Sequence, residues 1–317
     1  MKVFITREIP EIAETLLAKK RYDVSVYRET KPVSRSKLVQ KIQYVDAIIP
    51  LLTDKIDRTV IDNAFNLKVI ANYAVGFNNI DIEYAKSMNI VVTNTPDILT
   101  DSTADLAILL LLACARNLLE GEKYVRSKKF SGWQPRLLLG MELKNKILGI
   151  VGAGRIGFAT AKRAINFGMK IVYFDKNKNE RLENETCAKK ISLNKLMKIS
   201  DFISLHLPLC KDTYRMINKD KLDLMKPTAV IINTARGEIV DEEYLIKLLQ
   251  SNKIYAAGFD VYDNEPIINK HLLKLQNVVL LPHIASATFE ARFKMAELAA
   301  RNVINVLEGK NPITPVY

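Results

Sequence analysis

The sequence is poor in cysteine, histidine, glycine and tryptophan. Its 317 residues include three cysteines, three histidines, twelve glycines and a single tryptophan. The cysteines, Cys114, Cys187 and Cys210, are odd in number and widely separated, a pattern that predicts neither a disulfide framework nor a zinc site. We therefore expect a cytoplasmic protein that holds no metal.

Long apolar runs and blocks of like charge are also missing. The longest apolar stretch, 106–115, is too short to cross a bilayer, and the first residues begin a strand pattern rather than a signal peptide. The net charge of +12 comes from scattered lysines, with short clusters such as Lys128–Lys129 and no run of five or six like charges. A solvated surface explains this pattern better than a nucleic-acid stripe. We therefore expect neither a membrane nor a nucleic acid as partner.

What the sequence does contain is an alternation of strand-like and helix-like segments. From residue 3 to about residue 97, short apolar runs alternate with helical patterns, and the alternation restarts at residue 146. Such alternation is typical of βαβ units with a parallel sheet, so we predict two doubly wound α/β domains. The last helix, 289–307, ends before Gly309, a suitable C-terminal stop, and we expect it to pack on the first domain.

Chain length supports two domains, at roughly one per 150 residues. The predicted division is 1–100 with 285–317 for one domain and 101–284 for the other, which is inserted in the first. A helix is expected to begin after Asp101–Ser102, which are good N-cap residues, and its apolar composition predicts burial on all sides. The segment 127–140 breaks the pattern and is predicted to be an extended arm.

Three of the twelve glycines, Gly152, Gly154 and Gly157, lie within six residues, between a predicted strand and a predicted helix. This GxGxxG motif in this setting indicates a dinucleotide-binding turn, with the pyrophosphate at the helix N-terminus. Asp175 ends the next strand and can accept hydrogen bonds from a ribose 2′-hydroxyl, which favours NAD over NADP. Lys176 beside it keeps NADP open as the alternative.

Polar residues follow three later strands, in the segments 233–237, 260–266 and 282–288. Ligands of open α/β sheets bind at the carboxyl ends of strands, so these segments are candidate parts of one site. They supply a cation, Arg236, an acid, Glu265, and an imidazole, His283. Taken singly, each has a plain structural explanation: Arg236 as part of a surface ion pair, Glu265 as a solvated loop acid and His283 as a helix cap. Together, behind a dinucleotide motif, they favour catalysis.

The motifs GAGRIG (152–157), NTARG (233–237), FDVYDNEP (259–266) and PHIASAT (282–288) occur in the order typical of one family. The sequence resembles the D-isomer-specific 2-hydroxyacid dehydrogenases, and the glyoxylate/hydroxypyruvate reductases among them most closely. The resemblance implies a flavodoxin-like substrate domain with an inserted Rossmann NAD-binding domain. It also implies hydride transfer to a small 2-keto acid, with His283 as acid/base, Glu265 hydrogen-bonded to it, and Arg236 as substrate clamp.

By the same resemblance, further positions are expected to contact cofactor or substrate. The expected cofactor-binding residues are Thr103, Gly152, Gly154, Arg155, Ile156, Gly157, Asp175, Leu207, Pro208, Thr213, Thr234, Ala235, Arg236, Asp260, His283 and Ala285. The expected substrate-binding residues are Leu51, Val75, Gly76, Arg236 and His283. His206 is interpreted as adjacent to the cofactor, and His271 as solvated.

Departures from the family pattern bear on the substrate. Leu51 stands where phosphoglycerate-oxidising members usually carry a basic residue, which disfavours D-3-phosphoglycerate; D-lactate stays possible. The resemblance also implies a homodimer, in which the arm with Trp133 reaches a neighbouring subunit. A corepressor-like, NAD-sensing interaction protein of the same fold is the alternative from another functional class.

Overall fold

Apolar residues of the first hundred positions build a five-stranded, all-parallel sheet. Its strands are β1 (Lys2–Ile5), β2 (Asp23–Val26), β3 (Ala47–Ile49), β4 (Val69–Ala71) and β5 (Val91–Thr93). The order is β2-β1-β3-β4-β5, the flavodoxin-like arrangement, and every neighbouring pair is parallel. The inner strands are buried on both faces and therefore consist of continuous apolar residues, as in Ala47–Ile49.

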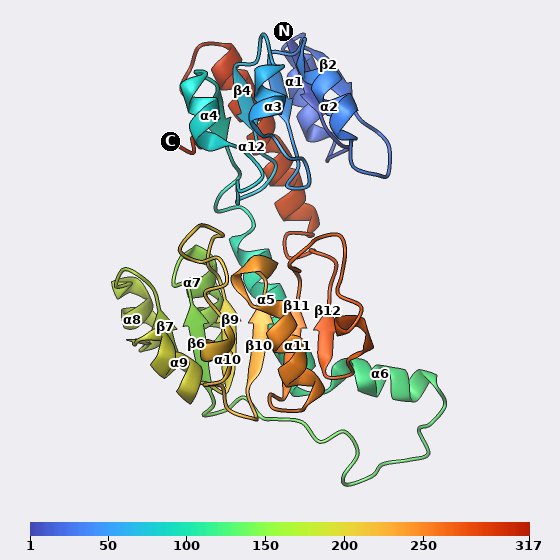
Figure 1. Ribbon diagram of the computed structural model, residues 1–317, viewed down its shortest axis with the longest axis vertical. Coiled ribbons are helices and arrows are strands. Elements are labelled where there is room, and N and C mark those ends of the chain that lie inside the picture. Colours follow the sequence, from blue (N-terminus) through green and yellow to red (C-terminus); the bar gives the residue numbers. More distant parts are fainter. The chain divides into compact units, whose positions relative to one another are not determined.

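Helices cover both faces of this sheet (Figure 1). One face carries α1 (Ile12–Lys19) and α12 (Phe289–Leu307), and the other carries α2 (Arg35–Ile42), α3 (Arg58–Asp62) and α4 (Ile82–Ser87). The helix α12 begins with the side chain of Thr288 accepting the N–H of Ala291, and it buries Met295, Ala299 and Val303 in the same cluster as α1. The C-terminal helix therefore completes the core of the N-terminal sheet.

The second sheet has seven parallel strands. They are β6 (Ile147–Val151), β7 (Lys170–Phe174), β8 (Lys189–Lys190), β9 (Phe202–Leu205), β10 (Val230–Asn233), β11 (Ala256–Phe259) and β12 (Val278–Leu280). Their order, β12-β11-β10-β9-β6-β7-β8, is that of a Rossmann fold with one added strand. The strand order reverses between β6 and β9, which is where such sheets bind dinucleotides.

This sheet is also covered on both faces (Figure 1). On one face lie α5 (Thr100–Ala115), α7 (Arg155–Ile165) and α8 (Glu180–Thr186), and on the other lie α9 (Leu193–Ile199), α10 (Lys219–Leu222) and α11 (Glu242–Gln250). The helix α6 (Leu118–Arg126) buries no residue.

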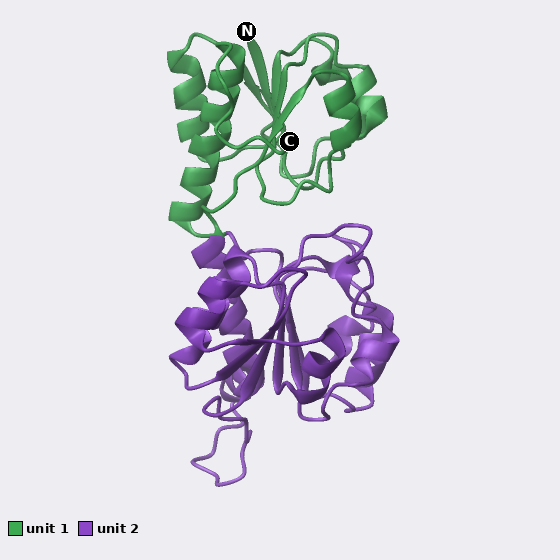
Figure 2. Ribbon diagram, turned by 90° about the vertical axis from the view of Figure 1, so that its left-hand side faces the viewer, with its two compact units in different colours: residues 1–99, 287–317 green, residues 100–286 purple.

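The structure, a computed structural model, describes residues 1–317 in two compact units: unit 1 is 1–99 with 287–317, and unit 2 is 100–286 (Figure 2). The predicted fold class, two doubly wound parallel-sheet domains with a Rossmann domain inserted in a flavodoxin-like one, is confirmed. No single helix is long and apolar enough to span a membrane; only the bent pair α5 and α6, 63° apart, meets that test by length and composition.

Two local expectations for α5 were wrong. The helix begins at Thr100, so Asp101 lies inside its first turn, where its carboxylate is 2.9 Å from Arg163 instead of capping the helix. Burial is also incomplete, because Leu109 is 49% exposed. A uniformly apolar helix can still present one side chain to solvent where no element covers it.

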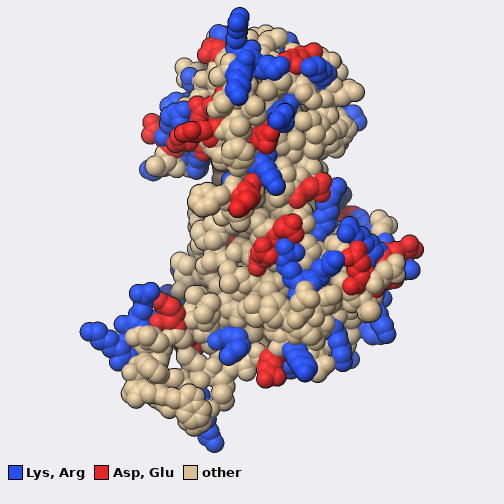
Figure 3. Space-filling model, turned by 180° about the vertical axis from the view of Figure 1, so that it is seen from behind, with Lys and Arg blue, Asp and Glu red and all other residues tan.

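The segment after α6, 127–146, contains no helix or strand, as predicted for an arm. Its Trp133 is 85% exposed, and Phe130 and Leu139 are exposed as well. On the face drawn in Figure 3, lysine and arginine are interspersed with aspartate and glutamate, as expected for a solvated surface.

Candidate active site

In the glycine turn between β6 and α7, neighbouring backbone lies so close to Gly152 and Gly157 that neither position has room for a side chain. Gly152 has a φ of +96°, and a Cβ at this position would lie 2.7 Å from the carbonyl oxygen of His206. A Cβ on Gly157 would lie 2.1 Å from the carbonyl oxygen of Gly152. Gly154 differs, because nothing lies within 4 Å of the Cβ position there, although this residue is the N-cap of α7. The turn therefore leaves its open side at the helix N-terminus, where a pyrophosphate is stabilised.

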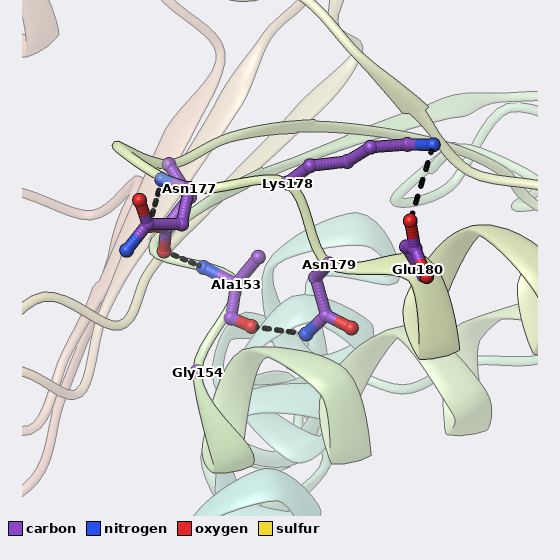
Figure 4. Close-up of a pocket in the computed structure, with 7 residues that line it drawn as sticks. Ala153, Gly154, Asn177, Lys178, Asn179 and Glu180 are labelled. Carbon is purple, nitrogen blue, oxygen red and sulfur yellow. Dashed lines mark hydrogen bonds and ion pairs between the residues drawn. The ribbon is translucent and has the colours of Figure 1, made fainter.

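A pocket of about 510 Å³ adjoins this turn and is shown in Figure 4. Its lining includes Ala153, Gly154 and Asp175. The two carboxylate oxygens of Asp175 accept the backbone N–H of Ala153 at 2.8 Å and of Asn177 at 3.2 Å. The amide of Asn179 donates to the carbonyl of Ala153 at 2.6 Å, so both walls of the pocket are tied together. Asp175 is thus held just after β7, with its carboxylate in the lining of the pocket.

The lysines beside Asp175 are paired with carboxylates. The ammonium of Lys176 lies 2.6 Å from the carboxylate of Asp212, and that of Lys178 lies 3.3 Å from Glu183. Both lysines are more than half exposed. Because each ammonium is paired with a carboxylate, the pocket has no unpaired lysine to bind a 2′-phosphate. It therefore favours an uncharged ribose 2′-hydroxyl.

The loop after β9 holds Leu207, Pro208 and Thr213, which were expected to bind the cofactor. The hydroxyl of Thr213 donates to the carbonyl of Pro208 at 2.6 Å and accepts the N–H of Cys210 at 2.8 Å, so the loop is internally fixed. His206 precedes it, and its Nε2 lies 2.9 Å from the hydroxyl of Ser204. Burial lowers the pKa of His206 to about 3, so this imidazole is neutral at physiological pH.

Two of the expected cofactor-binding residues carry buried hydroxyls without any hydrogen-bond partner. These are Thr103 in the first turn of α5 and Thr234 directly after β10. A buried hydroxyl without a partner is unfavourable, and a bound cofactor would supply partners at these two positions. Together with the open glycine turn, they show that unit 2 fits a dinucleotide.

His283 and Glu265 form a hydrogen-bonded pair. His283 follows β12 in the left-handed region, with φ at 54°, and its Nδ1 lies 2.7 Å from Oε2 of Glu265. The other carboxylate oxygen, Oε1, accepts the N–H of Tyr262 at 3.0 Å. Both side chains keep part of their surface exposed, 23% for His283 and 29% for Glu265. Nε2 is therefore the imidazole nitrogen left for a substrate.

Asp260 fixes the turn that carries His283. It is fully buried after β11, and its carboxylate accepts the N–H groups of Ile284 and Ala285, both at 2.8 Å. Burial raises the pKa of Asp260, and the two backbone N–H groups act against that rise. The segment 283–285, which includes the expected cofactor-binding residues His283 and Ala285, is thereby anchored to the end of β11.

Arg236 lies after β10 with most of its side chain shielded from solvent. Its Nη1 donates to the carbonyl of Ala235 at 2.6 Å. Burial lowers the pKa of Arg236, while the charges of Glu265 and Glu238 raise it. Since arginine stays protonated in proteins, the site keeps a fixed cation beside the Glu265–His283 pair.

The expected substrate residues Leu51, Val75 and Gly76 lie at the carboxyl edge of the sheet in unit 1. The carbonyls of Val75 and Gly76 accept the side-chain amides of Asn94 and Asn72, both at 2.8 Å. The N–H groups of Val75 and Gly76 donate to no group of the chain. The turn is therefore held by its carbonyls and offers two backbone donors, which is the arrangement that a carboxylate needs.

Sequence reasoning missed the residues that support the site. Asn72 and Asn94 come directly after β4 and β5, and Asp54 closes the loop after β3 by accepting the N–H of Leu51 at 2.8 Å. Their position after strands was a usable signal, because polar side chains at the carboxyl edge of a parallel sheet often position ligands.

Comparisons with known proteins agree with this geometry. A family model described as D-isomer specific 2-hydroxyacid dehydrogenase, NAD binding domain, matches residues 108–285. A curated relative, a glyoxylate reductase of Thermococcus litoralis, is 51% identical over 315 residues, covering 98% of this chain and 95% of the relative. A solved structure of a Thermus thermophilus protein has 42% identity and a TM-score of 0.95, with 100% of both chains covered. An NADPH-dependent glyoxylate/hydroxypyruvate reductase of Sinorhizobium meliloti has 31% identity and a TM-score of 0.87, covering 99% of this chain and 96% of its own.

Proposed function

Because the chain belongs to the D-isomer specific 2-hydroxyacid dehydrogenase family, we propose that it reduces a small 2-keto acid, glyoxylate or hydroxypyruvate, to the 2-hydroxy acid with NADH. The enzyme is an NAD-dependent oxidoreductase that acts on CH–OH groups. The observation that carries the proposal is the Glu265–His283 pair beside the largely shielded Arg236, all following strands of a sheet with a dinucleotide turn.

The reduced cofactor, when bound, supplies the hydride that the keto carbon accepts. His283 supplies the proton: Nε2 donates it to the keto oxygen, while Nδ1 stays hydrogen-bonded to Oε2 of Glu265. The carboxylate of Glu265 stabilises the protonated imidazole before the transfer and fixes its orientation. Positioned acid catalysis of this kind contributes about 10²–10⁴-fold to the rate.

Arg236 stabilises the negative charge that develops on the keto oxygen. Its guanidinium is largely desolvated, so the interaction is stronger than it would be in water. The planar fork of arginine also suits a carboxylate next to a carbonyl. The N–H groups of Val75 and Gly76 are proposed to bind the carboxylate, and Leu51 supplies no charge for a phosphate, which disfavours phosphoglycerate as substrate.

The proposed cofactor residues in unit 2 select NAD. Asp175 accepts ribose hydroxyls and repels a 2′-phosphate, while Lys176 is engaged by Asp212. The proposed pyrophosphate site is the N-terminus of α7 at Gly154, and Thr103 and Thr234 offer their hydroxyls to the nicotinamide end.

The active form is proposed to be a cytoplasmic homodimer. The exposed apolar side chains of α6 and the arm, among them Leu118, Val125, Phe130 and Trp133, are a suitable surface for a second copy. Light scattering of the wild-type protein and of Trp133→Ser tests this: a wild-type mass of one chain, about 36 kDa, contradicts it.

A substrate panel tests the proposed function. Purified enzyme is assayed with glyoxylate, hydroxypyruvate, pyruvate and phosphohydroxypyruvate, each with NADH and with NADPH. The expected result is the highest kcat/KM for glyoxylate or hydroxypyruvate with NADH. His283→Asn, which removes the acid but tolerates the left-handed backbone, should lose turnover and keep NADH affinity. Failure to reduce any of the four acids would overturn the proposal.

A further inference from the structure

One charged side chain in unit 1 lacks a partner. Arg7 comes two residues after the end of β1, and its Nη2 atom is shielded from solvent without a hydrogen-bond partner. No ion pair ties it to a carboxylate either. A shielded charged donor without an acceptor is unfavourable, and an anionic ligand would supply the missing acceptor.

Arg7 stands at the position where an open sheet of this order binds ligands. The strand order reverses between β1 and β3, and the N–H of Thr6 donates to the carbonyl of Ile49 at the carboxyl ends of these two strands. Ligands of doubly wound sheets bind outside the carboxyl ends at this reversal. Leu51, one of the proposed substrate residues, follows β3 at the same edge.

The charge of Arg7 acts on the carboxylate of Asp54, but Asp54 is hydrogen-bonded to other groups. Its Oδ2 accepts both the hydroxyl of Thr6 and the N–H of Leu51. Burial raises the pKa of Asp54, and these hydrogen bonds, with the charge of Arg7, oppose the rise. Asp54 therefore serves to hold the loop after β3, and no salt bridge joins it to Arg7, so the guanidinium can bind another anion.

We propose that Arg7 binds the carboxylate of the 2-keto acid, together with the N–H groups of Val75 and Gly76. The inference rests on the proposed function. β3 lies between β1 and β4, so the ends of β1 and β4 are about 10 Å apart at the usual strand spacing. An arginine side chain and a bound carboxylate together span that distance. The planar guanidinium and the two backbone donors then satisfy the carboxylate from opposite sides.

The test replaces Arg7 by Met, which keeps length and removes charge. Arg7→Met should raise the KM for glyoxylate about 10- to 100-fold, with kcat close to the wild-type value and NADH affinity unchanged. Oxalate, a carboxylate without a reducible carbonyl, should lose affinity by a similar factor in calorimetry. The melting temperature should stay close to the wild-type value, because Nη2 of Arg7 has no acceptor within the chain. Arg7→Lys should restore part of the affinity.

The control is Arg28→Met, since Arg28 lies in the same unit but is held by Glu8 at 2.8 Å and Glu14 at 2.7 Å. It should leave KM and oxalate affinity unchanged. An Arg7→Met enzyme with wild-type KM and oxalate affinity, or one whose melting temperature falls together with kcat, would overturn the assignment to substrate binding. If the wild type reduces none of the keto acids, the proposed function fails, yet oxalate calorimetry still decides whether Arg7 binds a carboxylate.

Discussion

The Nδ1 atom of His283 lies 2.7 Å from Oε2 of Glu265, and the same carboxylate accepts the N–H of Tyr262 through Oε1. Burial raises the pKa of Glu265, but the hydrogen bond and the charge of His283 outweigh it, and the pKa is lowered overall. Glu265 is therefore ionised over the whole physiological range, and the imidazole always faces a negative charge.

Replacing Glu265 by Gln removes that charge and keeps the shape. We expect kcat/KM for keto-acid reduction to fall by about 10²-fold or more. Steady-state kinetics with glyoxylate and NADH check this effect. Asp263→Asn alters a neighbouring acid of the same loop and should leave kcat/KM near the wild-type value; a Glu265→Gln enzyme with wild-type kcat/KM contradicts the role of the pair.

Arg236→Lys keeps a positive charge but removes the planar fork. We expect kcat/KM to fall by about 10²–10³-fold, because a single ammonium cannot hold both the carbonyl and the carboxylate oxygen. Steady-state kinetics with glyoxylate and a fluorescence titration with NADH separate substrate effects from cofactor effects. A variant with near-wild-type kcat/KM would show that only the charge is needed.

Replacement by Ala should affect different properties at Gly157 and Gly154: stability at the first and NADH affinity at the second. The Cβ of Gly157→Ala would lie 2.1 Å from the carbonyl oxygen of Gly152, so the turn must open, at a cost of about 1–3 kcal/mol or more. Gly154→Ala meets nothing within 4 Å, so stability should hold, while NADH affinity falls about tenfold because the methyl group occupies the approach to the helix N-terminus. Urea denaturation and NADH titration of both variants check this; unchanged NADH affinity in Gly154→Ala would move the pyrophosphate elsewhere.

Asp175→Ser should shift cofactor preference toward NADPH. Removing the carboxylate removes the repulsion of a 2′-phosphate, and the ratio of kcat/KM for NADPH to that for NADH should rise about tenfold or more. Because Asp212 engages Lys176 at 2.6 Å, adding Asp212→Asn should free the lysine and raise the ratio further. Asp212→Asn alone is the matched control. If the ratio does not change in Asp175→Ser, Asp175 does not contact the ribose.

Asp201 should make stability depend on acid pH. Its two carboxylate oxygens accept the N–H of Ile147 at 2.8 Å and the ammonium of Lys226 at 2.9 Å. Burial raises its pKa, but these bonds outweigh burial and lower it overall. A lowered folded-state pKa stabilises the fold above the unfolded pKa, and the contribution disappears as pH falls through the folded pKa. Asp201→Asn should cost about 1–3 kcal/mol near neutral pH and nothing in strong acid, measured by urea denaturation across pH. An equal difference at both pH values would contradict this origin.

The fold and the glycine turn could be predicted because their signals are local. Continuous apolar strands, helix-length spacers and three glycines in six residues follow directly from the chain, as do the polar residues after β10, β11 and β12. The engagement of Lys176 by Asp212 could not be predicted, since the two are far apart in sequence and meet only in the folded unit.

Arg7 was missed for a related reason. In sequence it is an arginine after a strand, which is usually a solvated residue. Only the fold reveals that Thr6 and Leu51 occupy the oxygen Oδ2 of Asp54 and that Nη2 of Arg7 is buried without an acceptor. The start of α5 was misplaced because Asp101 has a competing partner, Arg163, which no local capping rule can anticipate.

The contribution of α12 to the core of unit 1 has a consequence during synthesis on the ribosome. The N-terminal sheet must wait for Met295, Ala299 and Val303, which are made only after the whole of residues 100–286. At about 5–20 residues per second, that delay is about 10–40 s. Unit 2 is contiguous and can fold within it, so the domain that is translated second is the first to be completed. Until then, α1 alone covers the apolar face of β1, β3 and β4, so this face of the nascent chain stays partly exposed.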